Sequence, residues 1–181
     1  MKNNMKNLLT FNLVLLLAIS LHAQQRVFPI VKNYGGIFEI PNAVEKPDSS
    51  LNYNIVVEVF SGSEKPAELN YALNNVARLI NLHAIGGVSK KKIKVVVAIH
   101  GEAAYTLMQN DQYKVKYKTD NPNLALYKAL DEAGVQLFVC GQSLIARQID
   151  STKLIPEIKI ATSMLTVVST HQLKGYAFFK F

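Results

Sequence analysis

Apolar and polar positions change their spacing along the chain, and the changes predict strands and helices in alternation. Residues 53–60 (YNIVVEVF) are rich in β-branched and aromatic side chains, and residues 93–99 and 135–139 are nearly continuous apolar runs. Each of these three segments predicts a β-strand. Shorter runs at residues 158–161 and 176–179 predict two more strands near the end of the chain.

Helical spacing of apolar residues fills most of the gaps between these strands. Pro66 and Glu68 indicate the start of the first helix, and Gly86 with Gly87 indicates its end. A second long helix is predicted to begin at Asn121, as the capping residue before a proline, and to end at Gly134. Shorter helices are predicted at residues 103–109, 142–149 and 164–174, whereas the polar stretch 111–119 is predicted to be a connection.

Alternating strands and helices, with two strands that are apolar throughout, favour a mostly parallel sheet of roughly five strands with helices on both faces. In such sheets ligands bind beyond the carboxyl ends of the strands. The residues that fall at those ends are Ser61, His100, Cys140 and Thr162. Residues 24–52 contain many prolines, glycines and serines and predict an irregular lead-in, with one short strand at 36–40.

The first 23 residues have the layout of a secretory signal peptide. Lys2 and Lys6 precede an apolar core at residues 13–19, and Ala23 stands before the polar pair at residues 24–25. The apolar run is shorter than the roughly 20 residues that span a bilayer, so we expect cleavage after Ala23 and no stable membrane anchor afterwards. The mature protein is then expected to be periplasmic or secreted, with one α/β domain at residues 53–181.

Charge and cysteine content narrow the functional classes. Cleavage would leave 18 basic against 13 acidic residues, and the basic residues are scattered except for a cluster at 90–94 without interleaved aromatic residues. That pattern argues against nucleic-acid binding. The one cysteine, Cys140, has no partner for an internal disulfide, so it is buried and inert, paired between chains, or reactive.

Cys140 is the leading candidate for chemistry because a predicted helix begins directly after it, at Gly141, Gln142 and Ser143. Free N–H groups and the dipole at a helix amino end favour a thiolate. Gly141 lets a ligand approach the backbone closely, and Gln142 or Ser143 is a candidate hydrogen-bond donor. The alternative is an inert cysteine that fills a small core position, as most lone cysteines do.

His100, followed by Gly101, is the second candidate, because a histidine orients or deprotonates a thiol. The alternative is a histidine that only hydrogen-bonds backbone at the sheet edge. Arg147 either neutralises an anionic ligand or is solvated.

Other reaction classes find little support in the motifs. The order Ser143, Asp150, His171 suggests a hydrolase, but Ile145 stands where the nucleophile elbow has its second glycine. Glycine-rich nucleotide motifs are missing from the sequence, and the histidines lack metal-ligand spacing. We therefore expect neither a cofactor nor a metal.

Three segments of the second half of the chain resemble the DsrE/DsrF-like family of sulfur-oxidation and sulfur-relay proteins. They are residues 95–101 (VVVAIHG), 133–144 (AGVQLFVCGQSL) and 172–178 (QLKGYAF). The resemblance implies a flavodoxin-like three-layer α/β sandwich and homo-oligomers, often trimers or hexamers. In relay members a cysteine that follows a Gly-Val pair and its strand accepts sulfur as a persulfide, and Cys140 after Gly134 and Val135 holds that position here.

The first functional hypothesis is therefore a periplasmic sulfur carrier or sulfurtransferase-type protein that takes a small sulfur-containing or anionic ligand at Cys140. Relay members of the family are cytoplasmic, so an export signal separates this chain from their partners. The second hypothesis is a binding or assembly module of the same fold that binds a ligand without turnover.

Overall fold

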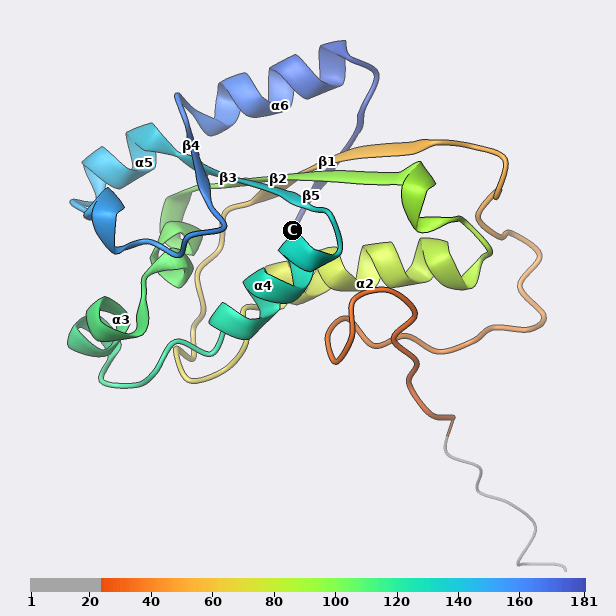
Figure 1. Cartoon of the computed structure of the whole chain (residues 1–181), viewed down its shortest axis with the longest axis horizontal. Coiled ribbons are helices and arrows are strands. Elements are labelled where there is room, and N and C mark those ends of the chain that lie inside the picture. The colour runs from red at the N-terminus through yellow and green to blue at the C-terminus, as the bar shows by residue number, and fades with distance from the viewer. Residues whose placement is uncertain (1–23) are drawn as a thin grey trace, which may run out of the picture.

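Five parallel strands form the sheet of this protein, whose computed structural model describes residues 24–181 (Figure 1). The predicted signal segment, residues 1–23, lies outside the described residues. The strand order is β4-β3-β2-β1-β5, and every neighbouring pair is parallel. The strands are β1 (Tyr53–Val59), β2 (Ile93–Ile99), β3 (Gln136–Cys140), β4 (Lys159–Ala161) and β5 (Ala177–Lys180).

Helices cover both faces of this sheet and make three layers, which confirms the predicted α/β sandwich. Two helices, α2 (Tyr71–Ile85) and α4 (Leu124–Glu132), lie on one face, and α6 (Met164–Leu173) lies on the other (Figure 1). The remaining helical elements are α3 (Asn110–Tyr117), α5 (Gly141–Ala146), and the 3-10 segments η1 (Lys90–Lys92), η2 (Gly101–Leu107) and η3 (Ser151–Lys153). Among residues 24–181, no helix combines the length and the apolar character needed to cross a membrane.

Side-chain alternation along the strands divides the core into two unequal parts. Val57, Val59, Ile99 and Val139 join the large cluster on the side of α2 and α4. The intervening residues of the same strands point to the α6 side, where the smaller cluster has Val56, Val96, Ala98 and Val167 as its buried residues and partly buried residues around them. Cys140, Glu58 and His100 fall on the α6 side by the same alternation.

The first helix begins later than the sequence predicts. Residues 65–68 form a turn, in which the Glu68 N–H donates to the Lys65 carbonyl at 2.9 Å, and α2 starts at Tyr71. The Asn70 side chain accepts a hydrogen bond from the Leu73 N–H at 3.1 Å, and its own N–H donates to Asn123 at 2.8 Å. A tertiary contact thus places the cap, which the local proline signal could not reveal.

The polar stretch 111–119, predicted as a connection, contains helix α3. Tyr113 is its one buried residue, and its hydroxyl donates to the Pro66 carbonyl at 2.9 Å. Helix α4 begins at Leu124 and not at Asn121. The Asn121 amide is instead buried and donates to the carbonyls of Thr106 and Met108, at 2.8 and 2.7 Å.

Residues 24–52 run along the α2 side and contain neither a helix nor a regular strand. The short strand predicted at 36–40 is reduced to one bridge, between Val27 and Ile37. Asn81 of α2 fixes this segment: its Oδ1 accepts from the N–H groups of Ile30 and Val31, each at 2.9 Å. Its Nδ2 donates to the carbonyls of Val31, Tyr34 and Gly35.

Candidate functional site

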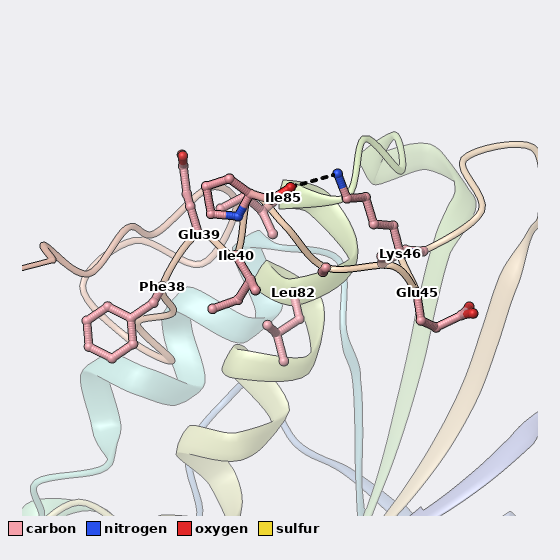
Figure 2. A pocket seen from close by; sticks show the side chains of 11 residues that line it. Phe38, Glu39, Ile40, Glu45, Lys46, Leu82 and Ile85 are labelled. Carbon is pink, nitrogen blue, oxygen red and sulfur yellow. Dashed lines mark hydrogen bonds between the residues drawn. The ribbon is translucent and has the colours of Figure 1, made fainter.

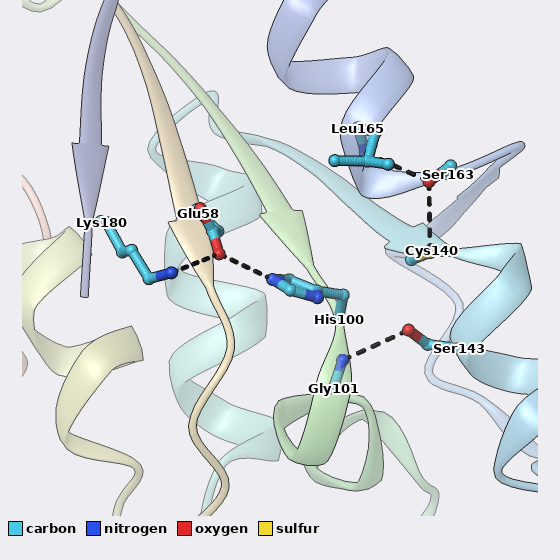
Figure 3. A network of polar contacts seen from close by, with 8 residues as sticks. All are labelled: Glu58, His100, Gly101, Cys140, Ser143, Ser163, Leu165 and Lys180. Atoms are coloured by element: carbon cyan, nitrogen blue, oxygen red, sulfur yellow. Dashed lines mark hydrogen bonds and ion pairs between the residues drawn. The ribbon is translucent and has the colours of Figure 1, made fainter.

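Cys140 lies where β3 ends and α5 begins, and it is the amino-terminal cap residue of α5. Its side chain points to the α6 side of the sheet, and the thiol donates to Ser163 Oγ at 3.9 Å (Figure 3). Ser163 is itself the cap of α6 and accepts from the Leu165 N–H at 3.2 Å. The amino ends of α5 and α6 therefore meet at Cys140, which is 6% exposed.

Burial of Cys140 works to raise the pKa of its thiol, but hydrogen bonds outweigh it and the pKa lies below the ordinary value. The donors are the Met164 backbone N–H, the side chain and backbone of Ser143, and the Ser163 hydroxyl. Hydrogen bonds to a charged form favour that form, and the amino end of α6 adds a positive dipole. The site stabilises a thiolate in partly desolvated surroundings.

Ser143 and Gly101 connect the two loops at this edge of the sheet. Ser143 Oγ accepts from the Gly101 N–H at 3.2 Å (Figure 3). Gly101 has a φ of +59°, and a Cβ there would also overlap the Phe60 ring. Gly141 packs against β4, because a Cβ would lie 2.9 Å from the Ala161 carbonyl oxygen. Both glycines hold the backbone close to its neighbours around Cys140.

His100 follows β2 on the same face as Cys140, and it contacts a carboxylate. Its Nε2 lies 2.9 Å from Oε1 of Glu58, and the same oxygen pairs with Nζ of Lys180 at 3.0 Å (Figure 3). Burial of Glu58 works to raise the pKa of its carboxyl, but the hydrogen bonds from Lys180 and His100 hold the pKa below its ordinary value. Within residues 24–181 no hydrogen bond joins His100 to Cys140.

Three other residues singled out in the sequence lie around Cys140 or away from it: Gln142, Arg147 and His171. Gln142 is exposed. Arg147 pairs with Glu102, with Nη2 and Oε1 3.2 Å apart, while its Nε is buried without a partner. His171 Nδ1 donates to the Val167 carbonyl at 2.8 Å, and its ring packs edge-to-face against Tyr176. Within residues 24–181 no hydrogen bond joins it to Ser143 in a hydrolase pair.

Sequence reasoning missed Glu58, Ser163 and Lys180. A single acidic residue in a strand that is otherwise apolar was an available signal for Glu58. Ser163 directly before the last predicted helix was a capping signal. Nothing local marks Lys180, which reaches Glu58 only because β5 pairs with β1. No group of three or more His, Cys, Asp or Glu side chains within residues 24–181 is arranged to hold a metal.

An apolar groove lies elsewhere, between residues 38–47 and the end of α2 (Figure 2). Phe38, Ile40 and Leu82 supply its apolar lining, and Lys46 Nζ donates to the Pro41 carbonyl at 3.4 Å beside it. Because α2 covers the face of the sheet opposite to Cys140, the groove is not part of the cysteine site.

Comparisons with known proteins agree with this geometry. A family model described as the DsrE/DsrF-like family matches residues 54–181. A solved structure of a protein of unknown function from Methanobacterium thermoautotrophicum superposes with a TM-score of 0.55 at 17% identity, over 71% of this chain and 99% of that chain. No curated protein matches the chain. The family match begins at the second residue of β1 and includes the site around Cys140, and the chain belongs to the DsrE/DsrF-like family.

Proposed function

We propose that this protein is a sulfur carrier that holds sulfur as a persulfide on Cys140. The observation that carries the proposal is the position of Cys140, the one cysteine of the chain: it caps α5 at the carboxyl end of β3, and its sulfur lies 3.9 Å from Oγ of Ser163, the cap of α6. The hydrogen bonds that lower the pKa of its thiol support the same chemistry. Family membership supports the same chemistry, because the resemblance in the sequence centres on the segment that contains Cys140.

The loading step needs only a donor that contains sulfane sulfur, such as a polysulfide or a low-molecular-weight persulfide. The Cys140 thiolate attacks the outer sulfur of the donor R–S–SH, the donor S–S bond breaks, and R–S⁻ leaves with the electron pair. The product is Cys140–S–SH, and both sides of the step carry one negative charge. Transfer to an acceptor thiolate is the same exchange in reverse.

Mass spectrometry of the intact protein tests this proposal. After incubation with sodium polysulfide and removal of excess reagent, the protein is expected to gain about 32 mass units, which a reductant removes. Peptide mapping should place the added sulfur on Cys140. If no donor gives the adduct and the thiol also resists alkylation near neutral pH, the cysteine is inert and the binding-module hypothesis takes its place.

The carrier is proposed to work as a homo-oligomer, a trimer or hexamer, assembled through the α6 side. Helix α6 buries only Val167, while Leu165 and Leu173 are 69% and 90% exposed. Phe178 of β5, which is in register with Val56 and so lies on the same side of the sheet, is 40% exposed. Exposed apolar side chains gathered on one side of a molecule are typical of protein interfaces.

Light scattering after size exclusion measures the assembly. The wild-type protein should elute as an oligomer, and Leu165→Lys with Leu173→Lys should reduce it to a monomer, since lysine at an apolar interface leaves a charge desolvated. Val115→Lys, which changes an equally exposed residue on α3, is the matched control and should leave the oligomer intact. A monomeric wild-type protein at micromolar concentrations would refute this assembly.

Residues 1–23 are proposed to direct export, which places the carrier in the periplasm or outside the cell. Support comes from the two lysines, the apolar core and the small residue before Gln24. Amino-terminal sequencing of protein recovered from the periplasm of an expressing cell should begin at Gln24. Recovery of the full chain from the cytoplasm would contradict export.

A further inference from the structure

The carboxylate of Glu58 is buried in an apolar strand, which costs free energy of folding. Its side chain is 10% exposed, and its neighbours Val56, Val57 and Val59 in β1 are fully buried. A buried carboxylate costs free energy unless it is paired and hydrogen-bonded, and an apolar residue in its place often leaves a fold as stable or more stable. The presence of Glu58 among the buried valines at the carboxyl end of β1 therefore points to a role beyond packing.

The contacts of Glu58 determine which nitrogen of His100 carries the proton in the neutral imidazole. The hydrogen bonds to Glu58 favour its ionised form, and an ionised carboxylate only accepts hydrogen bonds. Nε2 of His100, at 2.9 Å from Oε1, must therefore be the donor. Nδ1 is left as the basic nitrogen, and within residues 24–181 it makes no hydrogen bond.

The sheet register places His100 beside Cys140. Ile99 of β2 pairs with Val139 of β3, so the next residues, His100 and Cys140, are neighbours on adjacent parallel strands. Neighbouring strands are about 4.8 Å apart. Figure 3 shows the imidazole of His100 turned toward Glu58, with Cys140 and Ser143 on the other side of the end of β2.

We propose that Glu58 is a positioning residue that holds His100 as the Nε2–H tautomer, so that Nδ1 accepts the proton of Cys140 through one water. This inference rests on the proposed sulfur loading at Cys140. In the step, the S–H bond breaks, its electron pair stays on sulfur, and the proton bonds to Nδ1. The imidazolium that forms lies against the Glu58 carboxylate, which stabilises its charge, and Lys180 keeps that carboxylate ionised.

A double-mutant cycle, measured on the rate of sulfur loading, tests whether Glu58 acts through His100. A positioned general base contributes about 10²-fold or more, so His100→Ala should slow polysulfide loading and iodoacetamide alkylation about 100-fold at pH 7, and Glu58→Gln about 10-fold. The double variant should be no slower than His100→Ala alone, because Glu58 acts through His100. Glu68→Gln, which removes a surface carboxylate paired with Lys65, is the control and should leave both rates unchanged. Losses that multiply in the double variant would overturn the proposal.

A spectroscopic measurement separates positioning from a purely structural role. Two-bond ¹H–¹⁵N spectra of histidine-labelled wild-type protein should show His100 with a protonated Nε2 and a bare Nδ1. Glu58→Leu, which removes the acceptor, should give a mixture of tautomers in a protein that still unfolds cooperatively. A protonated Nδ1 in the neutral wild-type imidazole would overturn the proposal. If the wild-type protein takes up no sulfur, the proposed function fails, while the tautomer and the alkylation rate still decide the role of Glu58.

Discussion

A Cys140→Ser protein is expected to take up no sulfur at all and to give no product with iodoacetamide. The sequence contains no second cysteine, and a serine hydroxyl neither ionises near neutral pH nor forms a sulfur–sulfur bond. Serine differs from cysteine by one atom, so the helices α5 and α6 should keep their positions around it. The measurement is the intact mass after polysulfide treatment, where the gain of about 32 mass units should disappear.

The pH dependence of Cys140 alkylation provides the controls for this result. It is measured in native protein, in unfolded protein and in the variant Ser163→Ala. Hydrogen-bond donors from α5 and α6 lower the pKa of Cys140. Cys140 of the native protein should therefore reach half its maximal alkylation rate at a lower pH than Cys140 of the protein unfolded in urea, where a cysteine thiol has a pKa of about 8.5. Ser163→Ala removes a hydroxyl that lowers the pKa of Cys140, so its midpoint should move upward toward the unfolded value while loading remains detectable. A native midpoint at or above the unfolded one would contradict a stabilised thiolate.

Asn81→Leu is expected to cause the largest loss of stability among single substitutions outside the cysteine site. Asn81 is fully buried, and its amide satisfies two backbone N–H groups and three carbonyls of residues 30–35. Leucine has similar size but no polar atoms, so these backbone groups would be unpaired or would have to reach water. Each unsatisfied buried group costs about 1–3 kcal/mol, and we expect a combined loss of about 4 kcal/mol of unfolding free energy.

Urea denaturation measures the total effect, and amide hydrogen exchange at Ile30 and Val31 shows where the structure opens. Asn75→Leu is the matched control, because Asn75 lies on the same helix α2 and its side chain makes no hydrogen bond within residues 24–181. This control should change the unfolding free energy by less than about 1 kcal/mol. Equal losses in the two variants would show that the amide of Asn81 is not what fixes the amino-terminal segment.

Elements whose signals are local could be predicted well from the sequence. The continuous apolar run 93–99 is β2 with the same bounds, and Gly86 and Gly134 end their helices as predicted. Helix α3 was not predictable in this way, because its surface is polar and only Tyr113 packs inward. The start of α2 was misplaced for a related reason, since Asn70 is held by Asn123 from a distant part of the chain.

The sequence alone determined that Cys140 ends a buried strand and opens a helix, because an apolar run followed by Cys-Gly-Gln-Ser is a local pattern. It also determined the α/β class through the alternation of spacings. Only the tertiary structure decided what surrounds the sulfur atom. Ser163 reaches Cys140 from 23 residues away, and Glu58 reaches His100 from 42 residues away. Such contacts depend on the strand order β4-β3-β2-β1-β5, which brings distant strand ends to one edge of the sheet and has no counterpart in any local pattern.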